Sequence, residues 1–250
     1  SSKRFAVRMQ SMVHRRPSFM ASVRMTSPRI VQNEIVNGQN LLGVHIADGV
    51  MYAYRSGAEY AGIFPVWNWR RLPGITSEQK AEPPEIAKTN IRLGQRDFSG
   101  GVSDGMYGLA AMDFARGPLS ARKAWLFLDR EIVCLGAGIA NASDTLVCTT
   151  VNQCLSNGPV FVSESAKASV ALESDWRLPS SCWVYHDGIG YVFHEQNGLR
   201  AKTETKTGSW GDINVNAPKD QVSADVFSLW LDHGVHPARA AYHYAVAPGL

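Results

Sequence analysis

A single carboxylate stands among amides in the stretch RIVQNEIVNGQNLLG, residues 29–43. Glu34 is the first acidic residue of the chain, and amide side chains surround it: Gln32, Asn33, Asn37, Gln39 and Asn40. Amides donate and accept hydrogen bonds with polar groups, and a carboxylate can move a proton or hold a cation in place. The stretch therefore indicates either a site for a polar, negatively charged ligand or a solvated loop without chemistry.

The spacing of Glu34 and Asn37 depends on the local backbone. Residues three apart point to opposite faces of an extended strand, but they can converge in a tight turn, and Asn37–Gly38 is a turn signal. A carboxylate near Arg29 would stay ionised and could hold that guanidinium in one pose. The alternative is a turn that carries an ordinary surface glutamate.

Two tryptophans could form a sugar-binding surface. Trp67 and Trp69 lie in FPVWNWRRLPG, where alternation along an extended segment puts both rings on one face. An exposed aromatic face beside Arg70 and Arg71 would suit an acidic sugar. The alternative is that both rings fill the core.

Histidines and cysteines give no metal motif. His233 and His236 are three apart in a strand-like run, whereas ligands on one face of a strand need a spacing of two or four. We expect no metal and no cofactor, with calcium left open, and we interpret His233 as a hydrogen-bonded strand-end residue. Cys148 and Cys154 could form a disulfide in an oxidising compartment, which spacing alone does not decide.

Strands must position these side chains, because helical periodicity is nearly absent. Residues 41–57 predict two strands around Asp48–Gly49, and Asp187–Gly188 predicts another tight turn. Only residues 77–80 and 84–89 suggest helix, about one turn each. Many strands with turn signals every 8–12 residues or so predict an all-β protein, a large antiparallel multi-sheet β-sandwich with almost no helix.

The charge is unevenly distributed over the 250 residues, whose net charge is +3. The first 33 residues carry seven basic side chains and no acidic one. Such a start is compatible with a transit peptide, a nucleic-acid-binding arm or attraction of an acidic polymer. Residues 19–25 alternate and predict a strand, which argues against the transit peptide. We expect no nucleic-acid partner, and no apolar run reaches the roughly 20 residues that span a membrane.

A collinear series of runs covers almost the whole chain and resembles the central β-sandwich domain of polysaccharide lyase family 8, the hyaluronate, chondroitin AC and xanthan lyases. The runs are MVHRR (12–16), residues 27–43 with NEIVNGQN, WNWRRLPGIT (67–76), GGVSDGMYG (100–108), KAWLFLDREIVCLGAGI (123–139), TTVNQ (149–153), FSLWLDHG (227–234) and YHYAVAP (242–248).

The resemblance implies β-elimination at a uronic acid, in which the C5 proton is removed and the 4-linked sugar is expelled. In the family an Asn, a His, a Tyr and an Arg on a preceding α/α toroid domain do this work, and a Glu of the β-domain supports them. By motif position Glu34 is that Glu and Asn37 is the amide that faces the cleft. His14, although in a matching run, is not the family's catalytic His.

The resemblance also implies that residues 1–250 are one domain of a longer enzyme, without its helical domain and without a smaller C-terminal β-domain. We therefore expect a secreted or periplasmic bacterial lyase, monomeric, acting on hyaluronate, chondroitin or a similar acidic polysaccharide. This chain alone should be inactive. The predicted site residues are Glu34 as catalytic, with Asn37, Arg29, Trp67 and Trp69 as substrate-binding.

Two other function classes stay open. A non-catalytic carbohydrate-binding module would share the sandwich and the aromatic residues. A hydrolase could use paired carboxylates, for instance Glu34 with Asp48.

Overall fold

Strands dominate the molecule, as the sequence predicts. The computed structural model describes residues 3–6, 10–35, 37–80, 91–163 and 175–250. Within these ranges nineteen strands form four sheets, and the helical elements are four 3₁₀ turns. The prediction of an all-β antiparallel multi-sheet sandwich with almost no helix is confirmed.

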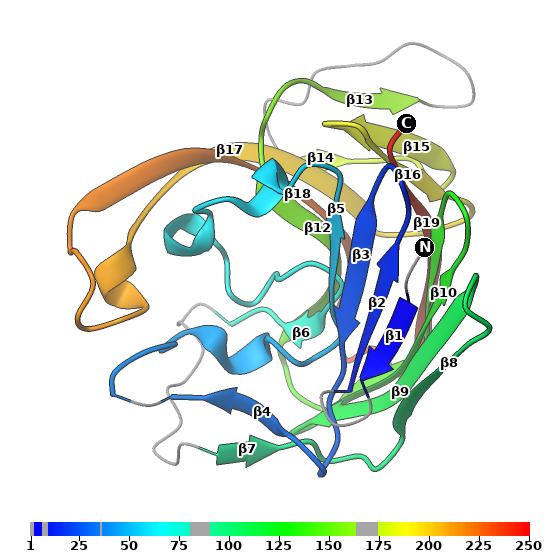
Figure 1. Ribbon diagram of the computed structural model, residues 1–250, viewed down its shortest axis with the longest axis horizontal. Coiled ribbons are helices and arrows are strands. Elements are labelled where there is room, and N and C mark those ends of the chain that lie inside the picture. Colours follow the sequence, from blue (N-terminus) through cyan, green and yellow to red (C-terminus); the bar gives the residue numbers. More distant parts are fainter. Residues whose placement is uncertain (1–2, 7–9, 36, 81–90, 164–174) are drawn as a thin grey trace.

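The largest sheet has eight strands and lies on the right in Figure 1. Its order is β13 (Val160–Ser163), β15 (Cys182–His186), β16 (Ile189–Phe193), β19 (Ala240–Pro248), β11 (Ile132–Asn141), β10 (Leu119–Phe127), β9 (Gly108–Arg116) and β8 (Ser99–Ser103). Every second residue of β10 is buried, from Leu119 to Phe127. This period of two gives the sheet one face that packs into the core.

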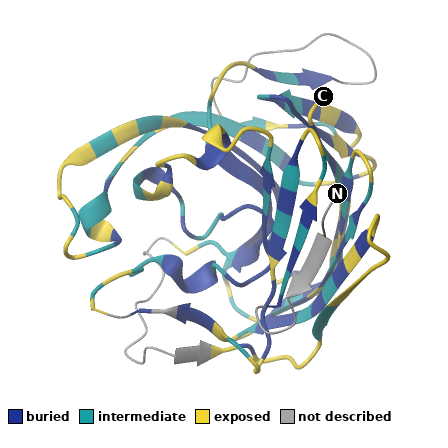
Figure 2. Cartoon of the chain, viewed as in Figure 1, coloured by how far each residue is buried: buried dark blue, intermediate teal, exposed yellow. Residues whose placement is uncertain are grey.

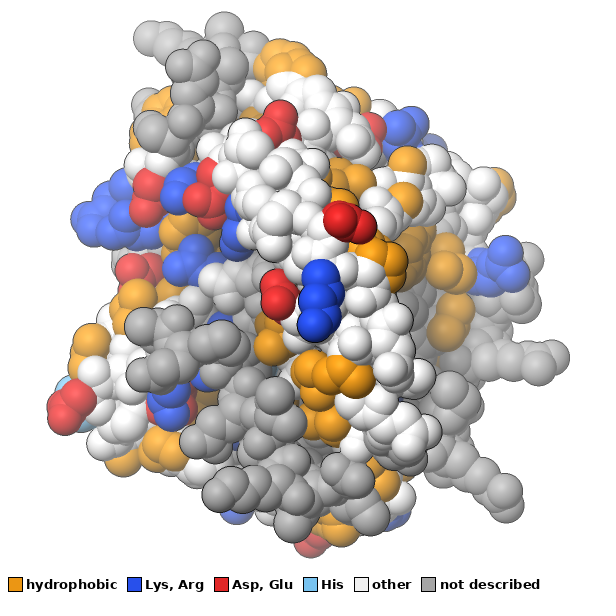
Figure 3. All heavy atoms as spheres, turned by 90° about the vertical axis from the view of Figure 1, so that its left-hand side faces the viewer, with side chains coloured by type: hydrophobic (Ala, Val, Ile, Leu, Met, Phe, Trp, Pro, Cys, Tyr) orange, Lys and Arg blue, Asp and Glu red, His pale blue; other side chains and the backbone are white. Residues whose placement is uncertain are grey.

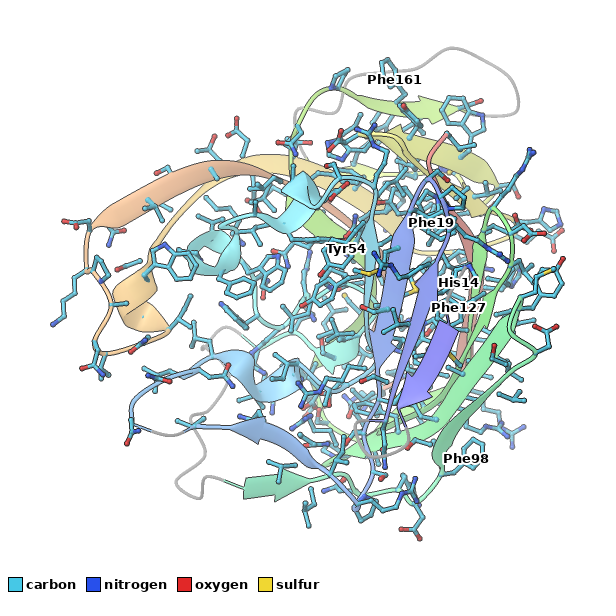
Figure 4. All side chains as sticks on the ribbon, in the orientation of Figure 1. His14, Phe19, Tyr54, Phe98, Phe127 and Phe161 are labelled. Carbon is cyan, nitrogen blue, oxygen red and sulfur yellow. The ribbon has the colours of Figure 1, made fainter. Side chains whose placement is uncertain are left out.

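A four-stranded sheet packs against that inner face. Its order is β1 (Lys3–Ala6), β2 (Ser11–Arg15), β3 (Met20–Arg24) and β5 (Val50–Tyr54). Figure 4 shows His14, Phe19 and Phe127 where the two sheets meet, and the His14 ring lies 5.6 Å from Phe19 and 5.5 Å from Phe127. The His14 Nε2 is 2.8 Å from the carbonyl oxygen of Leu128, so this histidine is a core residue. The strand predicted over residues 19–25 is confirmed as β3.

A five-stranded sheet completes the sandwich. Its order is β14 (Trp176–Arg177), β17 (Leu199–Ser209), β18 (Gln221–Val235), β12 (Leu146–Leu155) and β6 (Thr76–Glu78). Residues 147–154 of β12 are all buried, so both faces of this strand are covered. Asn152 joins the layers, because its amide accepts from Tyr60 at 2.9 Å and donates to Tyr191 at 2.6 Å.

The fourth sheet is a two-stranded ribbon, β4 (Val31–Glu34) and β7 (Ile91–Leu93), set apart at the lower left of Figure 1. Its register is irregular between Val31 and Glu34. The hairpin of β17 and β18 arches over the same side, and Figure 2 shows its alternating exposure. The left-hand side of Figure 1 thus carries the β4–β7 ribbon, whose strand β4 ends at Glu34.

The turn predictions had mixed outcomes. Asp187–Gly188 does join β15 to β16, with both residues at positive φ. Asp48–Gly49 does not join two strands, because a 3₁₀ turn, η1 (Gly43–His45), precedes it instead of a strand. Residues 77–80 are not helical, since β6 pairs there with β12. Residues 84–89 lie outside the described ranges.

Candidate functional site

The Asn37–Gly38 turn follows β4 on the side where the β17–β18 hairpin folds over. Asn37 has φ 53° and Gly38 φ 72°, so both residues adopt the left-handed conformation that the turn signal predicted. The carbonyl oxygen of Gly38 accepts the N–H of Val215 at 3.0 Å. A Cβ at position 38 would collide with the Val215 side chain, and the positive φ also favours glycine there. This packing leaves the Asn37 side chain exposed.

Glu34 is the last residue of β4, and its backbone pairs with Ile91. Its side chain lies outside the described part of the structure, so the predicted contact with Arg29 is untested. The amides around Glu34 separate into two groups. Gln32 and Asn33 are each 3% exposed, whereas Asn37 faces solvent. Only part of the amide-rich stretch is therefore available to a ligand.

Arg29 is tied to the start of the eight-stranded sheet. Its Nη1 donates to the carbonyl oxygen of Asp97 at 2.9 Å, and its Nη2 donates to that of Ser99 at 3.1 Å. These bonds fix the guanidinium on the backbone that leads into β8. They account for the position of Arg29 without a ligand.

Trp67 and Trp69 are core residues, each 6% exposed. Their rings meet edge to face at 5.5 Å, and the Trp67 indole N–H donates to the carbonyl oxygen of Gln153 on β12. The exposed-aromatic interpretation is therefore wrong for this chain. The reason is that the segment is not an edge strand: η3 (Phe64–Val66) ends just before Trp67 and packs against β17 and β18.

A buried cluster that no sequence pattern predicted lies next to β4, around Asp48 and Arg116. The carboxylate of Asp48 is 0% exposed and accepts two hydrogen bonds from Arg116, at 2.8 Å from Nε and 2.7 Å from Nη2. His45 Nδ1 lies 2.7 Å from the same carboxylate. Arg116 Nη2 also reaches Gln32 Oε1 at 3.1 Å and the carbonyl oxygen of Val44 at 3.1 Å. One guanidinium thus contacts two separate segments, residues 44–48 and β4.

The charged groups of this cluster form one ion pair, between Asp48 and Arg116. Burial alone would raise the pKa of Asp48, but the charge of Arg116 and the hydrogen bonds from His45 and Arg116 together lower it. Burial lowers the pKa of His45, so His45 is neutral and donates its Nδ1–H to Asp48. Asp48 is therefore an ionised structural partner. A hydrolase that pairs Glu34 with Asp48 does not fit this geometry, because the Asp48 carboxylate is 0% exposed and both of its oxygens accept from Arg116.

A small cavity opens beside the cluster. It has a volume of about 290 Å³ and is lined by Gln32, Leu93, Gln95, Ala115, Arg116 and Gly117. It lies between the β4–β7 ribbon and the end of β9, which explains the 19% exposure of the Arg116 side chain. No local motif could have predicted this pairing, since Asp48 and Arg116 are 68 residues apart in the sequence.

Lys123 lies close to the same cluster. It is 2% exposed and donates a hydrogen bond to the carbonyl oxygen of Gly74. Burial lowers its pKa to about 7, and Asp48 only partly opposes this shift. Lys123 therefore loses its proton near neutral pH.

Two further histidines, His233 and His186, and the cysteines have structural surroundings. His233 lies near the end of β18 and is 2.8 Å from the hydroxyl of Thr149, so the strand-end interpretation is confirmed. Burial lowers the pKa of His186 to about 4, so it stays neutral inside the β15–β16 hairpin. Cys148 and Cys154 are buried free thiols rather than a disulfide. Within the described residues no group of three or more His, Cys, Asp or Glu is placed to hold a metal.

Comparison with known proteins identifies the family. Residues 2–250 match the family model described as "Polysaccharide lyase family 8, super-sandwich domain". The chain belongs to polysaccharide lyase family 8. A chondroitinase-AC of Pedobacter heparinus is 42% identical over 95% of this chain and 34% of that protein. A hyaluronate lyase of Thermasporomyces composti is 36% identical over 96% of this chain and 32% of that protein.

A solved structure agrees with this membership. A chondroitinase AC lyase studied as enzyme–oligosaccharide complexes superposes with a TM-score of 0.92 and 40% identity, over 97% of this chain and 36% of that chain. The chain spans about a third of the length of the relatives it matches. The match therefore covers the super-sandwich portion of family 8 proteins.

The surface on the side of the β4–β7 ribbon carries a mixture of side-chain types. Figure 3 views it, and hydrophobic, basic and acidic side chains interleave over its described surface. None of the described helices is long and apolar enough to cross a membrane.

Proposed function

We propose that this family 8 domain is the β-sandwich part of a lyase that cleaves an acidic polysaccharide by β-elimination at a uronic acid. Family membership carries the proposal. The two relatives named above, a chondroitinase-AC and a hyaluronate lyase, support chondroitin or hyaluronate as the class of substrate.

The reaction needs three groups. The substrate carboxylate must be neutralised so that the C5 proton becomes acidic, a base must take that proton, and an acid must protonate the O4 atom that leaves. The C4–O4 bond breaks as the C4–C5 double bond forms. In this proposal a helical domain elsewhere in the same polypeptide supplies the base, the acid and the neutralising group.

Glu34 contributes from this side as a positioning carboxylate. It orients a cationic or phenolic group of the helical domain and does not touch the anionic substrate, which it would repel. Asn37 is exposed next to it and can hydrogen-bond a sugar hydroxyl or the amide of an amino sugar. Trp67 and Trp69 are buried and support the shape of the domain, whereas Arg29 is exposed and bonded to the backbone of Asp97 and Ser99.

The enzyme acts outside the cytoplasm of a bacterium, as a monomer, and needs no cofactor for the elimination. Large polymers such as hyaluronate do not enter cells, so a lyase that degrades them works in the periplasm or the medium. The cysteine thiols are all buried in the described fold, so oxidising surroundings leave them unpaired.

The test compares the 250-residue chain with the longer gene product that carries it. Both are incubated with hyaluronate and chondroitin, and unsaturated uronate is followed by ultraviolet absorbance. We expect elimination by the longer protein, a roughly hundredfold loss in its Glu34→Gln variant and none from the chain alone. Full activity of the isolated chain would refute the division of labour, and saturated products would indicate hydrolysis.

A further inference from the structure

The β4–β7 ribbon needs an anchor outside its own hydrogen bonds. Both strands are short, Val31–Glu34 and Ile91–Leu93, and neither pairs with a third strand among the described residues. An isolated two-stranded ribbon is marginally stable in water. Its position relative to the large sheets must come from side chains.

Gln32 provides that anchor. It lies in the middle of β4 with 3% of its surface exposed. Its Nε2 donates to Thr26 Oγ1 at 2.8 Å, and its Oε1 accepts from Arg116 Nη2 at 3.1 Å. Both ends of the amide are therefore engaged, one on the chain that leads into β4 and one on the eight-stranded sheet.

Arg116 and Asp48 connect the sheets to each other. Arg116 ends β9 of the eight-stranded sheet, and Asp48 lies two residues before β5 of the four-stranded sheet. Two guanidinium nitrogens meet the two carboxylate oxygens at 2.7 and 2.8 Å, a fork geometry that fixes the guanidinium plane. Because the guanidinium plane is fixed, the N–H of Nη2 that donates to Gln32 Oε1 also points in a fixed direction.

We propose that Arg116 and Asp48 are positioning residues that act through Gln32 to hold β4, and hence the backbone of Glu34, in register with the two large sheets. The inference rests on the proposed function for its catalytic consequence, but not for its structural part. Gln32 is two residues before Glu34, so a displacement of β4 reaches Glu34 directly. A misplacement of about 1 Å at a catalytic group can cost on the order of a hundredfold in rate.

Gln32→Met separates positioning from general stability. Methionine has nearly the same length and shape but offers neither the acceptor nor the donor, and it leaves the Arg116–Asp48 pair intact. Gln196→Met is the matched control. Gln196 is similarly buried, at 6% exposure, and it bonds to His243 of β19 rather than to β4.

The experiment uses the longer lyase that contains this chain. Hydrogen–deuterium exchange is measured at the amides of residues 31–35, and kcat and KM are measured with hyaluronate or chondroitin. We expect Gln32→Met to speed exchange in β4 at least tenfold and to lower kcat by about ten- to a hundredfold, with KM changed less than twofold. Gln196→Met should leave β4 exchange and kcat unchanged.

The outcomes separate the structural part of the proposal, the anchoring of β4, from its catalytic consequence. Unchanged exchange in Gln32→Met overturns the positioning inference, whatever the activity. Faster exchange with an unchanged kcat overturns its catalytic consequence. A wild-type protein without elimination activity refutes the proposed function, while the exchange result still tests the anchor. Arg116→Lys is the second variant, because an ammonium keeps the charge beside Asp48 but cannot copy the two-nitrogen fork; it should also speed β4 exchange.

Discussion

Replacing Lys123 with methionine should change how the stability of the chain depends on pH. Lys123 is 2% exposed, and burial lowers its pKa from 10.5 to about 7 in the folded state. In the unfolded chain the ammonium is hydrated and titrates near 10.4 or so. Between these two values the unfolded chain binds a proton that the folded chain has released.

The sign and the size follow from this difference. Stability rises with pH wherever the unfolded state binds more protons, by about 1.4 kcal/mol per pH unit for one group. Below the folded pKa both states are protonated and the slope vanishes. The wild-type chain should therefore gain about 3 kcal/mol from Lys123 between pH 6 and pH 9, and Lys123→Met should lack that gain.

The assay is urea unfolding of both proteins at pH 6, 7, 8 and 9, because the difference between them cancels the titration of every other group. The variant should be relatively more stable at pH 6 than at pH 9. Lys219→Met, at an exposed lysine, is the control and should show a constant difference. A constant difference for Lys123→Met as well would refute the argument that folding desolvates this ammonium.

Three further changes test the site and the core. Gly38→Ala should cost about 1–3 kcal/mol through its positive φ and the clash with Val215, measured by thermal unfolding, and a neutral result would mean that the turn can move. Asp48→Asn leaves the partly buried Arg116, whose side chain is 19% exposed, without its counter-charge and should cost roughly 3 kcal/mol at pH 7, the low end for a buried pair. Because the pKa of Asp48 is lowered in the folded state, wild-type stability is lost as pH falls through that pKa, and urea unfolding should show a smaller loss in the variant. Trp67→Ala should lower the free energy of unfolding by about 3–5 kcal/mol, whereas a binding module would yield a stable variant that has lost glycan affinity in titration calorimetry.

The sequence predicted the features that depend on neighbouring residues. The alternation of residues 19–25 became β3, and Asn37–Gly38 and Asp187–Gly188 became left-handed turns. Such signals are local, because side chains alternate along a strand and few residues tolerate positive φ. The all-β class followed from repeating them along the chain.

The wrong predictions share a different origin. Residues 41–47 alternate enough to suggest a strand, but a 3₁₀ turn there places His45 against Asp48, and no local pattern encodes that contact. Residues 77–80 have weak helical propensity, yet pairing with β12 overrides it. The tryptophans of residues 67–69 looked like a surface motif because only the tertiary packing on β12 buries them.

The charges around Asp48 connect the first prediction with the positioning inference. One buried carboxylate can compensate one cation, and two cations approach it, Arg116 and Lys123. A guanidinium is the cation that keeps its proton, whereas a desolvated ammonium gives it up. Asp48 therefore pairs with Arg116, and Lys123 is the cation that releases its proton near neutral pH while its Nζ donates to the carbonyl oxygen of Gly74. Apolar residues could fill this space with similar stability, but they would not give Arg116 a fixed direction toward Gln32. The ion pair of Asp48 and Arg116, where the ribbon meets the two large sheets, is thus better explained by orientation of β4 than by stability.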